Sequence, residues 1–340
     1  MGEGPILKLV MPAEQVLEPD PAPAPRGPAR GRRTGSRARC VLSVGGGKGG
    51  DGKSLISANL AIALARRGKR VVLVDADLGG ANLHTALGLE LPRRTLSDFI
   101  DHKVDRLEDV VTPTGVENLG LVSGALDNLE AATPRHAQKM RLLRHVRALD
   151  VDYAILDLGA GTHTNVLDLF LTSDHGVLVL VPEPTAVENA YRFVKAAFWR
   201  RVRNVAQVFG YEELLRGVMD GATFRSPVDL VASVVDRDPE AGANLARQLA
   251  VFRPRLVVNQ ARSWQDAEMG HAVVAAWRKY FGLEMDYLGA IDYDDEMWRA
   301  VRQRRPLLID RPEVAASLAF ERIADRLLLA EAAGRAADPA

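Results

Sequence analysis

A glycine-rich octapeptide between a predicted strand and a predicted helix is the feature that most constrains the fold. Residues 47–54 read GKGGDGKS, which fits the pattern GxxxxGK[ST], and they follow a buried-strand run at 40–44 and open a helical pattern at 54–67. Glycines let such a loop curl so that successive N–H groups point at phosphate oxygens, and the helix N-terminus adds partial positive charge. The sequence therefore predicts a phosphate-binding loop, in which Lys53 contacts the phosphates and the Ser54 hydroxyl ligates Mg²⁺.

A regular alternation of strand and helix patterns surrounds this loop. Further buried-strand runs lie at 71–74, 119–122, 153–156, 176–181, 256–259 and 285–291. Helical spacing falls between them, for example at 136–148 and 186–203. Strands that alternate with helices form a mostly parallel sheet with helices on both faces. We therefore predict an α/β fold with a doubly wound, mostly parallel sheet flanked by helices.

Composition excludes several kinds of site. The chain has 340 residues and one cysteine, Cys40, which excludes a disulfide framework, a Cys-based zinc site and an iron–sulfur cluster held within one chain. Seven histidines are scattered without HxH or HxxxH spacing. Lys plus Arg equal Asp plus Glu at 44 each, so the whole molecule does not indicate a polyanionic partner. The longest apolar runs are strand-sized, and we expect a cytoplasmic, soluble protein.

Residues 1–38 differ in composition from the rest of the chain. The first 40 residues hold seven of the 18 prolines and no aromatic residue, so this segment cannot bury enough apolar surface to offset its ordering entropy. We expect a disordered, Pro- and Arg-rich tail. It ends in an arginine-rich stretch, Arg26–Arg39, which we interpret as a solvated linker or, alternatively, as a weak electrostatic contact with DNA or an anionic membrane.

A second lysine, Lys48, precedes Lys53 by five residues, and ordinary P-loops do not require it. The resulting string KGGxGKS is the deviant Walker A motif, so the chain resembles the MinD/ParA family of P-loop ATPases. Residues 181–185 and 189–191 resemble the strand–helix junction of the FlhG/FleN flagellar-number regulators within that family. The resemblance implies a homodimer with ATP at its interface, in which Lys48 crosses to contact the nucleotide of the partner subunit.

Two further segments resemble conserved parts of this family's nucleotide site. Residues 74–83, VDADLGGANL, resemble the first switch. This implies that Asp77 positions the attacking water and that Asp75 lies beside the metal. The run DYAILD ends in Asp157 and fits the Walker B pattern of an apolar strand followed by a carboxylate. The resemblance gives Asp157 the role of holding Mg²⁺.

The second switch and the base site are expected further along the chain. Gly159 and Gly161 follow the Walker B strand like the second switch, where backbone amides can sense a γ-phosphate. Asn259 ends a strand and matches the family's base-contacting asparagine, and Asp292 ends the last strand. No NKxD guanine-reading motif follows Asn259, which favours ATP. The residues expected to contact the nucleotide are Gly47, Lys48, Gly49, Gly50, Asp51, Gly52, Lys53, Ser54, Leu55, Asn259 and Asp292.

Two positions depart from the family pattern. Asp51 stands where a small apolar residue is usual, and a carboxylate beside a triphosphate costs Coulomb energy. We therefore expect Asp51 to weaken ATP binding unless it bonds a lysine such as Lys48. Leu55 replaces a frequent second hydroxyl, which the flagellar branch also lacks.

The resemblance implies one ATPase domain at 39–330, between the tail at 1–38 and a short C-terminal tail at 331–340. Residues of about 199–253 would be a helical insertion, which either packs on the sheet edge or docks a protein partner. The tail could also bind such a partner. The implied activity is Mg-dependent ATP hydrolysis in a dimerising switch that sets flagellar number or position at the cell pole, which would bring it to the membrane periphery. Alternatives are ParA-like chromosome or plasmid segregation, septum placement, and a nucleotide-sensing scaffold that hydrolyses poorly.

Overall fold

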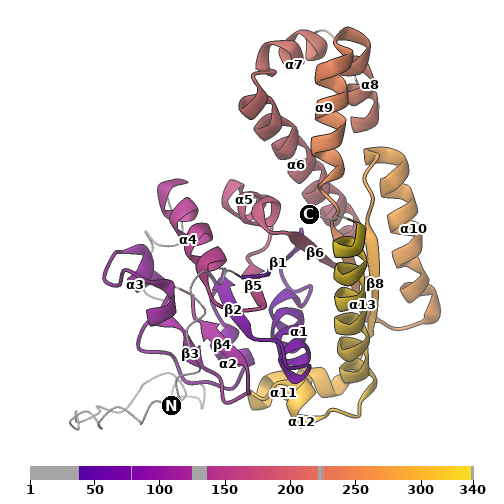
Figure 1. Ribbon diagram of the computed structural model, residues 1–340. Helices are drawn as coiled ribbons and strands as arrows, with labels where there is room; N and C mark the ends of the chain where they lie inside the picture. The colour runs from indigo at the N-terminus through magenta and orange to yellow at the C-terminus, as the bar shows by residue number, and fades with distance from the viewer. Residues whose placement is uncertain (1–37, 78, 125–135, 221–223, 225, 338–340) are drawn as a thin grey trace, which may run out of the picture. The chain divides into compact units, whose positions relative to one another are not determined.

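An eight-stranded sheet organises the chain (Figure 1). The computed structural model describes residues 38–77, 79–124, 136–220, 224 and 226–337. The strand order is β3-β4-β2-β5-β1-β6-β7-β8, and every neighbouring pair is parallel except β3 and β4. The predicted doubly wound, mostly parallel sheet is therefore confirmed. The strands are β1 (Cys40–Gly45), β2 (Val71–Ala76), β3 (Thr112–Pro113), β4 (Leu119–Val122), β5 (Tyr153–Leu158), β6 (His175–Leu180), β7 (Arg255–Ala261) and β8 (Asp286–Asp292).

Helices connect the strands and cover the sheet. The helix predicted at 136–148 has the same bounds in the structure. The helix predicted at 186–203 is longer in the structure and extends to Phe209. The helices are α1 (Lys53–Arg66), α2 (Leu83–Ala86), α3 (Leu96–Ile100), the 3-10 helix η2 (Leu107–Val110), α4 (His136–Ala148), α5 (Thr164–Thr172), α6 (Pro184–Phe209), α7 (Glu212–Met219), α8 (Pro227–Arg237), α9 (Pro239–Ala250), α10 (Trp264–Phe281), α11 (Asp295–Gln303), α12 (Leu307–Asp310) and α13 (Ala315–Ala337).

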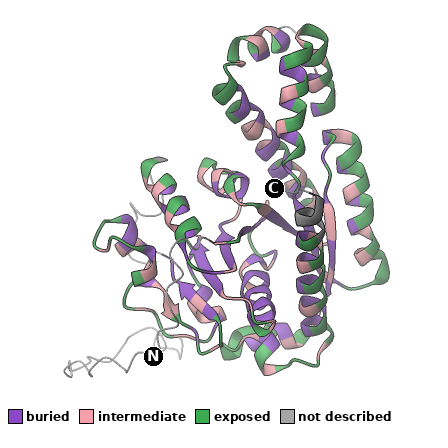
Figure 2. Cartoon of the chain, viewed as in Figure 1, coloured by how far each residue is buried: buried purple, intermediate pink, exposed green. Residues whose placement is uncertain are grey.

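The core divides between the two faces of the sheet. One apolar cluster joins the sheet to α3, α4, α5, α6 and α10, with Phe99, Phe170 and Phe193 fully buried in it. The other joins the sheet to α1 and α13, with Leu60 and Phe320 fully buried. Every residue of β1, β2 and β5 is buried, as Figure 2 shows for the strands at the centre. Buried central strands read as continuous apolar runs, which is why the sequence identified them.

The segment 199–253 is helical, as expected. It comprises the C-terminal part of α6 followed by α7, α8 and α9. The long α6 ends at Gly210, whose φ of 73° is a left-handed conformation that glycine adopts without a side-chain clash. The residues of α8 and α9 that point inward, such as Leu230 and Leu249, join the apolar cluster of the α6 face. The insertion thus shares the core of the sheet.

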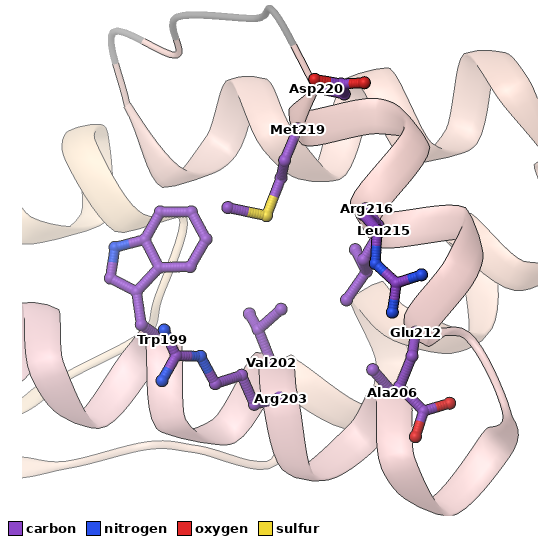
Figure 3. Close-up of a pocket in the computed structure, with 9 residues that line it drawn as sticks. All are labelled: Trp199, Val202, Arg203, Ala206, Glu212, Leu215, Arg216, Met219 and Asp220. Atoms are coloured by element: carbon purple, nitrogen blue, oxygen red, sulfur yellow. The ribbon is translucent and has the colours of Figure 1, made fainter.

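An apolar cavity of about 570 Å³ lies inside the insertion, between α6 and α7. Trp199 and Val202 of α6 face Leu215 and Met219 of α7 across it (Figure 3). Charged side chains of both signs, including Arg203 and Glu212, stand at its edge. The mixed charges indicate no particular class of ligand.

Candidate functional site

Strand register brings the predicted site residues to one edge of the sheet. β1, β2 and β5 are parallel neighbours, so their carboxyl ends lie together. Asp75 of β2 is the register partner of Asp157 of β5, and Val44 of β1 pairs with Asp157 on its other side. The phosphate loop leaves β1 at this same edge. Residues that are far apart in the sequence thus meet where open α/β sheets bind their ligands.

Close backbone approaches require glycine at two loop positions. A Cβ at Gly47 would lie 2.2 Å from the carbonyl oxygen of Asn189 on α6. Gly52 has a φ of 88°, and a Cβ there would lie 2.3 Å from Nδ2 of Asn259. The loop is therefore fixed between the start of α6 and the end of β7.

The two loop lysines point in different directions. Lys53 is buried, and its Nζ donates a hydrogen bond to the carbonyl oxygen of Lys48 at 2.8 Å, so it lies across its own loop. The Lys48 side chain instead leaves the loop and pairs with Glu183, the residue that precedes α6, at 3.2 Å. Both partners of this pair are largely exposed, so it contributes less than about 1 kcal/mol to stability. Lys48 is therefore held weakly at the mouth of the loop.

Asp157 and Asp75 form a buried acidic pair behind the loop. Asp157 accepts hydrogen bonds from Ser54 and Ser57, the latter at 2.8 Å. Burial raises the pKa of Asp157 to about 6, although these bonds and Lys53 act in the opposite direction. Sequence reasoning missed Ser57; its spacing of three residues from Ser54 puts both hydroxyls on one helix face and could have indicated it.

Asp75 is also held by backbone donors. Its carboxylate accepts hydrogen bonds from the N–H groups of Leu83 at 3.0 Å and Asp77 at 3.3 Å. Burial raises the pKa of Asp75 to about 7, and the charges of Asp157 and Asp77 add to the effect. Two adjacent carboxylates with raised pKa values form a pair that a bound cation would stabilise in the charged form.

The segments predicted as the first and second switches meet at Asp77. A Cβ at Gly159 would lie 2.8 Å from Oδ1 of Asp77, so that carboxylate packs directly on the Gly159 backbone. Gly161 has a φ of 92°, and its N–H donates to the carbonyl oxygen of Gly46 at 3.2 Å. The second switch therefore contacts both the first switch and the base of the phosphate loop.

Asn259 supports the loop backbone. It is buried, and its Nδ2 donates to the carbonyl oxygen of Asp51 at 2.8 Å. Its Oδ1 is buried without a hydrogen-bond partner among the described residues. Asp292 lies at the end of the neighbouring strand β8 and is exposed. Leu55 is half-buried on α1 and packs against the α1–α13 cluster.

Asp51 is buried beside the loop lysines. Its side chain is 2% exposed, and burial raises its pKa while Lys53 and then Lys48 lower it. The carboxylate therefore lies inside the loop region, close to both ammonium groups.

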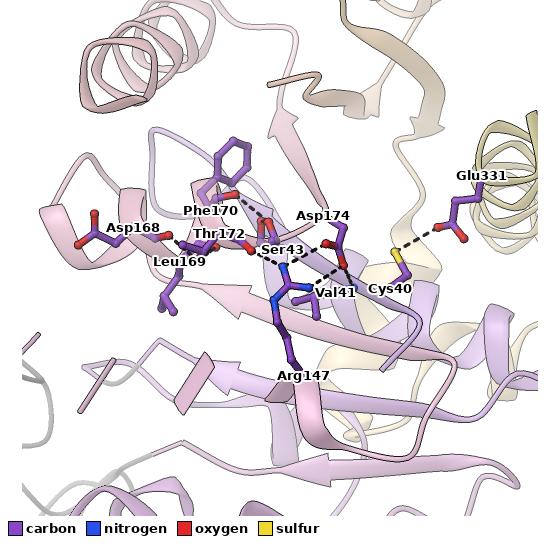
Figure 4. Close-up of polar contacts among 11 residues, drawn as sticks. Cys40, Val41, Ser43, Arg147, Asp168, Leu169, Phe170, Thr172, Asp174 and Glu331 are labelled. Atoms are coloured by element: carbon purple, nitrogen blue, oxygen red, sulfur yellow. Dashed lines mark hydrogen bonds and ion pairs between the residues drawn. The ribbon is translucent and has the colours of Figure 1, made fainter. Parts of the chain in front are cut away.

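A second buried polar cluster lies at the opposite, amino-terminal edge of the sheet, and Figure 4 shows one of its contacts, between Cys40 and Glu331. The Cys40 thiol donates to Glu331 of α13 at 3.3 Å, and the Tyr153 hydroxyl donates to the same carboxylate at 2.5 Å. The ligand atoms of Cys40, His175 and Glu331 lie within 4.8 Å of one another. However, the Arg255 guanidinium lies 4.0 Å from Glu331, and its positive charge opposes a cation. We assign the cluster to fastening α13 onto the sheet.

Residues 37–208 match the ParA family, described as NUBPL iron-transfer P-loop NTPase, which is half of the chain. The chain therefore belongs to the ParA family of P-loop NTPases.

Particular relatives agree with this assignment. The antiactivator FleN of Pseudomonas aeruginosa is 29% identical over 289 residues, which cover 84% of this chain and 85% of FleN. The flagellum site-determining protein YlxH of Helicobacter pylori is 26% identical over 84% of this chain and 81% of its own length. The fold resembles the septum site-determining protein MinD of Pyrococcus horikoshii complexed with Mg-ADP, at a TM-score of 0.60, 20% identity, and coverage of 85% of this chain and 95% of that one. The resemblance to the MinD/ParA family and to FleN is therefore confirmed.

Every helix among the described residues is either too short or too polar to cross a bilayer.

Proposed function

We propose that this protein is an ATP-hydrolysing switch that dimerises around two nucleotides and controls the number or position of flagella at the cell pole. The main support is the meeting of a deviant Walker A loop with Asp75, Asp77 and Asp157 at one edge of the sheet. YlxH, which is named as a flagellum site-determining protein, and the antiactivator FleN both align over most of this chain and favour that role.

The loop binds the triphosphate. Lys53 exchanges the Lys48 carbonyl for a phosphate oxygen, which is a stronger, charge-assisted acceptor. The loop N–H groups and the start of α1 supply further donors. Asn259, whose Oδ1 lacks a partner among the described residues, can accept a hydrogen bond from the amino group of adenine. Asp292 borders the base from the end of β8.

Ser54, Asp75 and Asp157 fit a Mg²⁺ ion. The fit rests on the two buried carboxylates of Asp75 and Asp157, which are register partners on neighbouring strands. Burial raises the pKa of both, and a bound cation would favour their charged forms. Ser54 adds a hydroxyl ligand next to Asp157, and oxygen donors suit this cation. When bound, Mg²⁺ would offset the charge of the phosphates during transfer.

In this proposal, hydrolysis depends on residues of the two predicted switches and on Lys48. Asp77 orients the attacking water, and its contact with Gly159 ties that role to the second switch. Gly159 and Gly161 report the presence of a γ-phosphate through their backbone amides. Lys48 leaves Glu183 and contacts the nucleotide of the partner subunit, where its charge stabilises the transition state.

Other contacts of the protein belong to this proposal. A protein partner binds through the insertion or the N-terminal segment, and the protein works in the cytoplasm, peripherally at the membrane or the pole. Residues 1–37, which contain most of the Arg26–Arg39 stretch, lie outside the described residues, so their weak contact with DNA or anionic membrane stays a prediction. The predicted C-terminal boundary at 330 falls inside α13.

The direct test is light scattering with Mg-ATP and Mg-ADP, together with an ATPase assay. We expect a dimer with ATP, a monomer with ADP, and slow turnover that matches dimer dissociation. A monomer that hydrolyses ATP at the same rate at every protein concentration would contradict the proposed switch.

A further inference from the structure

A large apolar groove lies beside the nucleotide site, between α6, α8 and α10. Its volume is about 1240 Å³. The apolar wall comes from Val187 and Tyr191 of α6 and from Met269, Trp277 and Tyr280 of α10. This volume exceeds the range of about 300–1,000 Å³ that small-molecule sites occupy, so the groove suits a segment of protein better than a metabolite. α8, which belongs to the insertion, forms one side of it.

The edge of the groove is acidic. Glu183 and Glu188 stand on the α6 side and Asp229 on the α8 side, and all three are exposed, although Glu188 pairs with Arg192 of the same helix at 2.6 Å. Lys279 is the one cationic side chain among the described residues that line the groove. An apolar floor with an acidic edge complements a helix that has one apolar face and basic residues beside it.

Glu183 belongs both to this edge and to the nucleotide site. Its carboxylate holds Nζ of Lys48 at 3.2 Å in an exposed, weak pair. The same helix, α6, supplies the Asn189 carbonyl on which Gly47 packs. A molecule in the groove therefore contacts the helix that supports the phosphate loop, and a basic group on it would compete with Lys48 for Glu183.

We propose that this groove docks a cationic amphipathic helix of a protein partner, and that a basic side chain of that helix forms an ion pair with Glu183 in place of Lys48. Because released Lys48 is free to cross to a second subunit, docking favours the ATP-bound dimer. By linkage, ATP-dependent dimerisation strengthens docking by the same factor. The coupling rests on the proposed function, whereas the docking itself does not.

A pair of neighbouring alanines on α10 gives a matched test. Ala276 lines the groove and Ala275 does not, although both are exposed on the same helix. Ala276→Arg adds bulk and positive charge to the groove, and Ala275→Arg adds the same side chain outside it. The probe is a labelled amphipathic helix of leucine and lysine, about four turns long, and its counterpart has glutamate at each lysine position.

Binding is measured by fluorescence anisotropy with the full chain and no nucleotide. We expect the lysine peptide to bind the wild type and Ala275→Arg equally, and to bind Ala276→Arg at least about tenfold more weakly. The glutamate peptide should bind the wild type at least about tenfold more weakly than the lysine peptide. Equal binding of the lysine peptide to wild type and Ala276→Arg, or preference for the glutamate peptide, would overturn the proposed docking.

Two other occupants are separate outcomes. If removal of residues 1–37 makes peptide binding much tighter, the chain's own N-terminal segment fills the groove and the proposed partner is wrong. If the wild type without nucleotide dimerises in light scattering and Ala276→Arg does not, the occupant is a second copy of the chain, which also overturns the proposal.

The coupling has its own variant, Glu183→Gln. The lysine peptide should still bind this variant, within about threefold of wild type, because the apolar wall remains. Adding the lysine peptide should lower the ATP concentration that the wild type needs for dimerisation. The same peptide should leave that concentration unchanged for Glu183→Gln. An equal shift in both proteins would refute the exchange at Glu183. Because peptide docking is measured without nucleotide, a failure to dock would not contradict the proposed ATPase function. Conversely, a protein that does not bind ATP could still bind the peptide.

Discussion

At the scale of single residues, the lysines of the loop are placed by contacts that a phosphate can replace. Lys53 donates to the Lys48 carbonyl inside the loop, and Lys48 pairs with Glu183 outside it. A neutral carbonyl is a weaker acceptor for an ammonium group than a phosphate oxygen. The proposed function therefore gives the two lysines distinct tasks, Lys53 within its own site and Lys48 at the site of the partner subunit.

Replacing Lys53 with alanine should reduce the affinity for ATP by at least about tenfold. The lost contact is charge-assisted, and such hydrogen bonds contribute about 1.5–3 kcal/mol each. Calorimetric titration with Mg-ATP measures the effect. Lys103→Ala, at a surface lysine that pairs with Asp98, serves as the control and should bind like the wild type. Equal affinity of Lys53→Ala and wild type would remove the phosphate role from Lys53.

Asp51 should make ATP binding depend on pH. Burial raises its pKa, and an incoming triphosphate raises it further, so binding takes up a proton at this carboxylate. The affinity attributable to Asp51 therefore increases as pH falls through its pKa and decreases as pH rises. Asp51→Asn should bind ATP more tightly than the wild type at pH 8, and the difference should shrink as pH falls toward the pKa of the carboxylate. Weaker ATP binding by the variant at pH 8 would show that the carboxylate makes a useful contact instead.

At the scale of elements, parallel strands position the site and glycines set the distances between elements. β1, β2 and β5 bring the loop and both buried carboxylates to one edge. α6 and β7 then fix the loop from either side through Asn189 and Asn259. The spacing between these elements leaves no room for a side chain at Gly47 or Gly52.

Alanine substitutions at two loop glycines should differ sharply in their effect on folding. A Cβ at Gly47 would meet backbone atoms of α6, whereas a Cβ at Gly49 has no described atom within 4 Å. We expect Gly47→Ala to lower the free energy of unfolding by about 1–3 kcal/mol, as overpacking does. Gly49→Ala should stay within about 0.5 kcal/mol of the wild type. Urea denaturation measures both, and equal stability of the two variants would show that α6 does not confine the loop.

The sequence predicted the elements better than the contacts between them. Apolar runs identified the longer strands, because strands buried on both faces have no polar alternation to obscure them. The two-residue β3 carries no such pattern. The pairing of Lys48 with Glu183 joins residues 135 apart, and no local pattern encodes it.

At the scale of the whole molecule, the proposed switch couples nucleotide state to assembly. The side chain of Lys48 points away from its own loop, and Asp77, in the segment predicted as the first switch, packs on Gly159 of the predicted second switch. In the proposed cycle, a site completed by a second subunit would be inactive until the dimer forms, and hydrolysis would then remove the γ-phosphate that holds the dimer together. Each half of this cycle can be blocked separately.

Asp77→Ala should bind ATP and fail to hydrolyse it. The carboxylate acts on the attacking water, so its loss affects the transition state more than the ground state. The variant should accumulate as an ATP-bound dimer, which size-exclusion chromatography with light scattering detects. An unchanged kcat would remove Asp77 from the mechanism.

The most direct measurement is ATP hydrolysis by an equal mixture of Lys48→Ala and Asp77→Ala subunits. Each variant alone lacks one group at both of its sites and should be inactive. A mixed dimer contains one site with an intact Asp77 that receives Lys48 from the other subunit. Random pairing in a two-fold symmetric dimer therefore restores up to about a quarter of the wild-type activity. If the mixture stays inactive while the wild type forms active ATP-dependent dimers, Lys48 does not act on the nucleotide of the partner subunit.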